Sequence, residues 1–560
     1  MENILIILNS KEIEPALRLT ADMESYRIYT HDPHLIDHIR IRGLKNVEFF
    51  NWENCIGFPE CEKSALDTAL LVEARLAASA KVFFPEMSIQ AWQYPPLVHM
   101  YLVLKWFSGL WRDFPKRKTD KYFVFVLDNP SILNLWSYLP SVLLLELLNA
   151  NGFEFSAFSY GGKPAEQVMI PNLIGKHQGD CGLLTHIPTC VYDFVYFNEE
   201  LAATGKPVIN LESSHSNVPV FGSNSIGLAD VEELIPALPE DLRGKMENFT
   251  KRIHDDLSEL IGVYIKSPAY RDRQAQQIAR VYRSQVAFYF LLQQYFHQTK
   301  PAKIIISDHD AGIHGPLISF AQDNGIPVVM LPHSKRTNDI PYDYEDITCL
   351  THPIQGASIS NGNGKPVRNF RLSFPEALSG STVFPPKIEN ICLILNELCC
   401  TGVYYTRINP YLDGIRRISA WCSENKVTLS IRCKPSMPFI TLLTTATGIE
   451  ISSLFNSMTG PMTEFTKGKD LCLMYDAPTS GIVEFLRASV PVLNPVPEPL
   501  SPSEASTVHT DLVPRGSIEE ILGQLDSFMK DRANFLKFRN AQFGNYVSAF
   551  KDAQPLRAFL

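Results

Sequence analysis

The sequence lacks the features that mark membrane-spanning, exported and disulfide-stapled proteins. No window reaches 18 uninterrupted apolar residues, and the nearest candidate, 98–114, contains charged side chains, so no spanning helix is expected. The N-terminus has an acidic Glu2 and only a short apolar run at 4–8, which predicts no signal peptide. The 11 cysteines form no CxxC pair. We therefore expect reduced thiols in a cytoplasmic protein.

Basic residues are in deficit. Lys and Arg number 51 against 60 Asp and Glu, a net charge of −9, which argues against a nucleic-acid partner. A chain that is 45% apolar and 20% charged is neither disordered nor fibrous. No short repeat recurs along the sequence, which excludes solenoids and propellers. With 560 residues, two to four domains are expected at roughly 100–200 residues each.

The pattern that is present is an alternation of buried strands and helices. It predicts an α/β fold built on doubly wound parallel sheets. In the first half, strands are expected at 4–8, 121–127, 153–158, 191–197 and 207–211, a buried helix at 141–148, and a helical insertion near 235–300. A βαβ unit follows, with strands at 303–307 and 328–331 around a helix at 316–323.

The stretch 338–386 is rich in Gly and Pro and reads as irregular, so a domain boundary is expected at 380/381. A second α/β series follows, with strands at 390–395, 427–433, 470–474 and 490–493, helices at 410–423 and 481–488, and a helical tail at 518–550. We therefore predict two Rossmann-like domains, 1–380 and 381–560, facing each other across a cleft. This is the GT-B arrangement of nucleotide-sugar glycosyltransferases.

Three motifs resemble bacterial surface-polysaccharide glycosyltransferases, above all the capsule and lipopolysaccharide Kdo transferases and their sialyltransferase-like relatives. They are RCKP at 432–435, TSGIVE at 479–484 and NGIPVVMLPHS at 324–334. The family shows His-Pro where this chain has Ser436-Met437, and Gln-His-Gly where it has Pro-His-Ser. The resemblance implies transfer of a sugar, first of all Kdo or another CMP-linked acidic sugar, from a nucleotide sugar to a glycan or lipid-linked glycan acceptor, without a bound metal.

The second half carries the expected donor-binding residues. The turn Thr479-Ser480-Gly481 precedes a helix and is either an anion site or a plain N-cap. The resemblance implies that Glu484 binds the ribose or the sugar of the donor. The alternative is an ordinary acidic residue in the first turn of a helix, where the helix dipole favours it. A loop in the usual place of a phosphate loop, but without a GxGxxG pattern, carries Glu397 and Thr401.

Basic side chains lie at or just after the ends of two predicted strands. Arg432 and Lys434 alternate along a strand and so share a face, which suits an anionic donor or a solvated edge. His333, Lys335 and Arg336 follow the strand at 328–331. They are predicted to contact the donor phosphate or an acidic sugar.

The loop after the strand at 303–307 carries the candidate catalytic residues Asp308, His309 and Asp310. A mixture of Asp and His without Cys is a poor zinc signature, so a carboxylate acting as base or nucleophile, with His as its partner, fits better. Asp310 is placed slightly ahead of Asp308. The alternative is a loop held by Asx turns.

Aromatic and basic residues are mixed over 92–121. This suits a peripheral contact with the inner face of the cell membrane, or a core helix followed by a basic turn. Three other functions remain open on the same fold: a nucleotide-sugar epimerase, a polyol-phosphate transferase, and a non-catalytic GT-B-like partner in envelope assembly.

Overall fold

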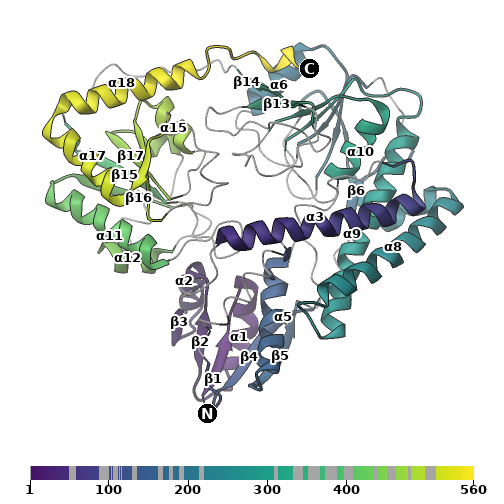
Figure 1. The fold of residues 1–560 in the computed structure, drawn as a ribbon, viewed down its shortest axis with the longest axis horizontal. Coiled ribbons are helices and arrows are strands. Elements are labelled where there is room, and N and C mark those ends of the chain that lie inside the picture. Colours follow the sequence, from purple (N-terminus) through teal and green to yellow (C-terminus); the bar gives the residue numbers. More distant parts are fainter. Residues whose placement is uncertain are drawn as a thin grey trace.

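In the computed structural model, the described residues form three parallel sheets, at three corners of a triangular outline (Figure 1). We call them the first, middle and last sheets in chain order. The structure describes residues 2–49, 58–87, 100–101, 104, 111, 114, 116–128, 135–161, 168–175, 181–187, 194–213, 220–307, 313–331, 345–350, 366–372, 387–395, 408–433, 439–448, 450, 462–476, 481–498 and 512–560.

The first sheet has the strand order β3-β2-β1-β4-β5, so its direction of winding switches between β1 and β4. The central strands β1 and β4 are apolar runs buried on both faces, as a parallel sheet requires, whereas most of the edge strand β5 is exposed or half-buried. The strands of this sheet are β1 (Asn3–Ile6), β2 (Arg27–Thr30), β3 (Val47–Phe49), β4 (Lys121–Leu127) and β5 (Glu154–Tyr160), with helices α1 (Ile13–Thr20), α2 (Pro33–Ile41), α3 (Phe58–Phe83) and α5 (Leu135–Ala150).

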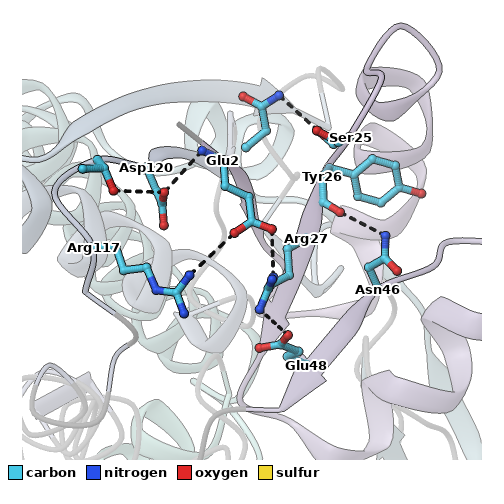
Figure 2. A network of polar contacts seen from close by, with 10 residues as sticks. Glu2, Ser25, Tyr26, Arg27, Asn46, Glu48, Arg117 and Asp120 are labelled. Atoms are coloured by element: carbon cyan, nitrogen blue, oxygen red, sulfur yellow. Dashed lines mark hydrogen bonds and ion pairs between the residues drawn. The ribbon is translucent and has the colours of Figure 1, made fainter.

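The amino ends of the first sheet are joined by an ionic network. Figure 2 shows Glu2 between Arg27, at 3.0 Å, and Arg117, at 3.8 Å, while Arg27 also contacts Glu48 at 2.6 Å. These side chains are partly exposed, so solvent screens the pairs and each adds little to stability. The network joins β1, β2 and β3 to the segment before β4, at the edge opposite to the one where ligands bind in such sheets.

The middle sheet has the order β14-β13-β12-β11-β7-β8-β9. Its switch of direction falls between β7 and β11, which pair in parallel from Lys303 opposite Leu183 to Ile306 opposite His186. Its strands are β7 (Leu183–His186), β8 (Val208–Leu211), β9 (Asn224–Ile226), β11 (Lys303–Ile306), β12 (Val328–Met330), β13 (Ile347–Leu350) and β14 (Arg368–Arg371), with helices α6 (Phe194–Ala203), α8 (Glu240–Ile261), α9 (Pro268–Tyr295) and α10 (His314–Asn324).

The last sheet has the order β16-β15-β17-β18-β19, with its switch between β15 and β17. Two apolar clusters cover its faces. Its elements are β15 (Asn390–Leu395), α11 (Ile408–Glu424), β16 (Thr428–Arg432), α12 (Ile440–Thr447), α14 (Met462–Phe465), β17 (Leu471–Tyr475), α15 (Gly481–Arg487), β18 (Val492–Val496), β19 (Arg515–Ser517), α17 (Ile518–Lys530) and α18 (Arg532–Ser548).

The first and middle sheets share one apolar core. A single cluster runs from Ile4 through α8 and α9 to Ile304 and Ile306 of the middle sheet. The opposite face of the middle sheet belongs to another cluster, which includes Ile305 and Phe559. Alternate residues of β11 therefore point into different cores, as the period of a strand dictates.

The end of the chain returns to the middle sheet. In Figure 1, α18 leads from the last sheet toward the middle one. Beyond α18, Gln554 forms a parallel bridge with Leu372, and the Phe559 ring lies 4.3 Å from that of Phe370. The backbone N–H of Leu556 donates to the Tyr196 hydroxyl at 3.1 Å. Residues 554–560 thus fasten the last-sheet body to the middle-sheet body.

The predicted α/β class with parallel sheets is confirmed. Residues 1–380, expected to form one Rossmann-like unit, contain two parallel sheets. The sequence did not separate the two sheets, because many of the strands are only three or four residues long and give little periodic signal. The strand predicted at 191–197 was wrong: α6 covers Phe194–Ala203. The stretch 338–386, expected to be irregular, contains β13 and β14. The 380/381 boundary lies outside the described residues.

Candidate functional site

The switch point of the last sheet lies where β15 and β17 end. Tyr475, the final residue of β17, is fully buried and donates its hydroxyl to the Tyr411 carbonyl at 2.6 Å. Asp476 follows with φ +61°, a left-handed conformation that Asp tolerates better than most residues. Its N–H donates to the Pro495 carbonyl at 2.9 Å, and its carbonyl accepts from Asn494 Nδ2 at 2.8 Å. The backbone is thereby fixed where a ligand would approach.

Arg432 ends β16 at the same edge. It is only 8% exposed, and its guanidinium lies 5.2 Å from the centroid of the Phe465 ring. Lys469 Nζ lies at 5.2 Å from that ring too and donates to Ser430 Oγ at 2.8 Å. Burial lowers the pKa of Arg432, but a guanidinium remains charged in proteins. Arg432 is thus a buried cation beside an aromatic ring rather than a residue on a solvated edge.

Gly481 and Glu484 lie on α15, the helix that follows β17. Gly481 begins the helix, and Glu484 stands one turn later with 31% of its side chain exposed. Its Oε1 is 3.9 Å from Arg487 Nη1. Arg487 also lowers the pKa of Tyr546 of α18, which burial raises. Glu484 therefore has a long, partly solvated ion pair and retains acceptor capacity for a ligand hydroxyl.

All the other predicted site residues lie outside the described residues. These are Asp308, His309, Asp310, His333, Lys335, Arg336, Glu397, Thr401, Lys434, Thr479 and Ser480. The structure does place the residues that flank them. Ser307 ends the segment before the Asp308–Asp310 loop, and His314 begins α10 after it; both are buried.

His186 is a candidate that the sequence analysis missed. It ends β7 beside the switch point of the middle sheet, opposite Ile306 of β11, and is fully buried. Its Nδ1 lies 3.1 Å from the Leu211 carbonyl. Because a carbonyl only accepts, Nδ1 carries a proton and donates to it. The only signal was a four-residue strand, LLTH.

The carboxyl ends of the first and last sheets are turned toward each other. Helix α2 follows β2, helix α12 follows β16, and the two helices touch. The rings of His34 and Phe439 lie 5.3 Å apart at 74°. The Asp37 carboxylate accepts hydrogen bonds from Thr441. Residues after strands of two different sheets therefore meet at one contact.

The aromatic and basic stretch 92–121 is described only in part. Trp111 stacks on buried Phe114 at 5.4 Å and meets Phe153 edge-on at 5.6 Å. These two rings therefore pack on the core. No helix in the part of the chain that the structure describes is long and apolar enough to span a membrane. Within that same part, no cluster of three or more His, Cys, Asp or Glu side chains could hold a metal ion.

No protein-family model and no curated protein sequence matches the chain. Solved structures do resemble it. The glycosyltransferase SnogD from Streptomyces nogalater matches with 11% identity and a TM-score of 0.35, over 68% of this chain and 98% of its own. Trehalose 6-phosphate synthase from Burkholderia multivorans matches with 8% identity and a TM-score of 0.38, over 66% and 95%. UDP-GlcNAc 2-epimerase from Methanocaldococcus jannaschii matches with 10% identity and a TM-score of 0.30, over 65% and 98%. With TM-scores below 0.5, this likeness transfers no function to the chain.

Proposed function

We propose that the protein is a GT-B-type glycosyltransferase that moves a sugar from a nucleotide sugar to a glycan acceptor. The observation that carries the proposal is the contact of α2 with α12, which turns the carboxyl ends of two doubly wound sheets toward each other. Ligands of open α/β sheets bind outside those ends. Two facing binding edges suit a reaction that joins two substrates. The motifs at 324–334, 432–435 and 479–484 support the same reaction.

We assign the donor to the edge of the last sheet. Arg432, buried at the end of β16, would offset the charge of the departing nucleotide phosphate, together with Lys434 and the Thr479-Ser480 turn. The proposal also requires the carboxyl edge of the middle sheet to face the donor, so that His333, Lys335 and Arg336, which follow β12, would supply further positive charge. Glu484 would accept a hydrogen bond from a donor hydroxyl.

The chemical step requires a base for the acceptor. In the inverting form of the proposal, the acceptor hydroxyl oxygen attacks the anomeric carbon and its proton passes to Asp310, with Asp308 as the alternative and His309 as partner. The bond between the anomeric carbon and the phosphate oxygen breaks, and the nucleotide leaves with the electron pair. Because arginine and lysine can offset this charge, the proposal needs no metal ion.

The first donor to test is CMP-Kdo or another CMP-linked acidic sugar. A buried arginine at the binding edge suits an anionic sugar, whose carboxylate it can pair with in a bidentate way. The acceptor would be a bacterial surface glycan or its lipid-linked precursor at the cytoplasmic face of the membrane. The stretch 92–121 would then give the peripheral contact.

A nucleotide screen tests the proposal. Melting temperatures measured with CMP, CDP, UDP, GDP and ADP should show one clear stabiliser, since a ligand at 100 times its Kd adds about 2.7 kcal/mol. Arg432→Ala should abolish that shift. Arg416→Ala, an exposed arginine paired with Asp413 at 2.9 Å, should keep it.

The same screen separates the alternatives. Stabilisation by UDP, with interconversion of UDP-sugars in the absence of acceptor, would replace the transferase with an epimerase. If no nucleotide raises the melting temperature, the proposal fails in favour of a non-catalytic assembly partner.

A further inference from the structure

Helix α12 begins with a cap supplied by a distant part of the chain. Its own N-cap residue, Phe439, makes no side-chain capping bond. Instead Asp37 of α2, 404 residues earlier, accepts a hydrogen bond from the Thr441 N–H at 3.2 Å and another from the Thr441 hydroxyl. An acidic group at this position satisfies a free N–H group and complements the helix dipole. The first turn of α12 is thus stabilised from the first-sheet body.

An aromatic chain leads from the same contact to the switch point of the last sheet. The His34 ring meets Phe439 at 5.3 Å, Phe439 meets Tyr411 at 6.2 Å, and Tyr411 meets Tyr475 at 4.8 Å. Each step is edge-to-face, the preferred geometry of aromatic pairs. The four rings are buried, and the last three are at most 1% exposed. Tyr475 is bonded to Asp476, the left-handed residue at the donor edge.

We infer that Asp37 and His34 are positioning residues for the donor edge: the first-sheet body sets the donor-binding conformation of the last sheet through α12 and the Phe439–Tyr411–Tyr475 chain. This inference rests on the proposed function for the identity of the ligand. Close-packed rings have few alternative arrangements, so a shift of α12 is passed to Tyr475 and to the backbone of Asp476. A nucleotide at that edge binds the arrangement that the first-sheet body stabilises.

Hydrogen exchange on the nucleotide-free full chain tests the coupling itself. Asp37→Ala and Thr441→Val should each speed amide exchange about three- to tenfold in 440–447, from the usual worth of an N-cap, and in 471–476 as well. Asp37→Asn keeps a capping acceptor and should restore most of the protection. Asp22→Ala, an exposed aspartate just after α1, is the matched control and should change neither segment.

Faster exchange confined to 440–447 would overturn the inference, because Asp37 would then be a helix cap and nothing more. The double variant Asp37→Ala/Thr441→Val should exchange no faster than Asp37→Ala alone, since Asp37→Ala already removes both hydrogen bonds to Thr441. Additive effects would mean that the two residues act separately.

Nucleotide titration then measures the effect on binding. With the nucleotide that stabilises the wild-type protein, Asp37→Ala should raise the Kd about three- to tenfold and Asp37→Asn should restore it. An unchanged Kd in Asp37→Ala overturns the inference while the proposed function stands. If no nucleotide binds the wild-type protein, the proposed function fails, and the exchange in 471–476 still decides whether the coupling exists.

Discussion

The side-chain amide of Gln542 pairs with the backbone of Val492 as a neighbouring strand would. Its Oε1 accepts from the Val492 N–H at 2.8 Å, and its Nε2 donates to the Val492 carbonyl at 2.7 Å and to the Leu512 carbonyl at 2.8 Å. All three contacts are buried. Helix α18 is therefore held to β18 by hydrogen bonds as well as by apolar packing.

Gln542→Ala should lower the free energy of unfolding by about 2–4 kcal/mol, because it leaves backbone groups buried without partners. Chemical denaturation of the full chain measures this loss. Asn540→Ala, two residues away and exposed, should cost less than about 0.5 kcal/mol. If the two changes lower the free energy of unfolding equally, the hydrogen bonds of the Gln542 amide do not stabilise the fold.

Gly414 of α11 lies against Tyr475, and a Cβ there would overlap the Tyr475 hydroxyl. That hydroxyl is buried and bonded to the Tyr411 carbonyl, so it has little room to move. Gly414→Ala should destabilise the protein by roughly 1–3 kcal/mol. Gly523→Ala in α17, where nothing lies within 4 Å, should stabilise it by about 0.5–1 kcal/mol. If thermal denaturation shows that both variants raise the melting temperature, or that both lower it, the close contact of Gly414 with Tyr475 does not decide the effect.

Glu484→Ala should raise the donor KM at least tenfold and leave the melting temperature within about 2 °C of the wild-type value. The small effect on stability follows from its long and partly exposed pair with Arg487, which is worth roughly 0–1 kcal/mol. Asp310→Asn should cut kcat sharply with a similarly small thermal effect. Transfer assays and thermal denaturation check both variants. A large fall in melting temperature would mean that the residue supports the fold instead.

Glu12 gives stability a pH dependence. Its side chain is fully buried and accepts from the Leu8 N–H at 2.6 Å, Asn9 Nδ2 at 2.6 Å and Ser141 Oγ at 3.1 Å. Burial raises its pKa from 4.5 to about 8, against the opposing effect of these donors. The unfolded chain therefore loses this proton at a lower pH than the folded chain. The contribution of Glu12 to the free energy of unfolding is greatest below pH 4.5 and is lost as the pH rises toward 8. The slope contributed by this group is at most about 1.4 kcal/mol per pH unit.

Urea unfolding at pH 5, 6.5 and 8 measures that slope. Glu12→Gln cannot ionise and should flatten it between pH 5 and 8. Glu14→Gln, exposed on α1, should leave it as in the wild type. If Glu12→Gln has the same slope as the wild type, Glu12 does not change its ionisation on folding over this range, and the assignment fails.

The sequence predicted long apolar strands well and short ones poorly. The strands at 390–395 and 121–127 have the predicted bounds, because five or six consecutive apolar residues fit a strand buried on both faces. By contrast, β7, β13 and β14 have four residues each, too few for a period to emerge. The run at 191–197 is apolar enough for a strand, yet α6 begins at Phe194 and buries Tyr196 and Phe197 as parts of a helix.

The sequence offered candidate site residues only where a recognisable motif lies next to a predicted element. Arg432 and Glu484 are such candidates, because their motifs end β16 and begin α15. Asp37, His34 and His186 are not, since their placement depends on which sheets meet and in what order. Sequence spacing carries no record of a contact between residues 404 positions apart, which arises from tertiary packing alone.

The chain leaves the middle sheet at Leu372 and comes back to Leu372 through Gln554. The last-sheet body is therefore attached to the middle sheet by the segment that follows it, beside the strand that precedes it in the chain. The Asp37–Thr441 contact is a separate attachment, to the first-sheet body. A variant that removes the Asp37–Thr441 contact therefore leaves the attachment at Leu372 in place.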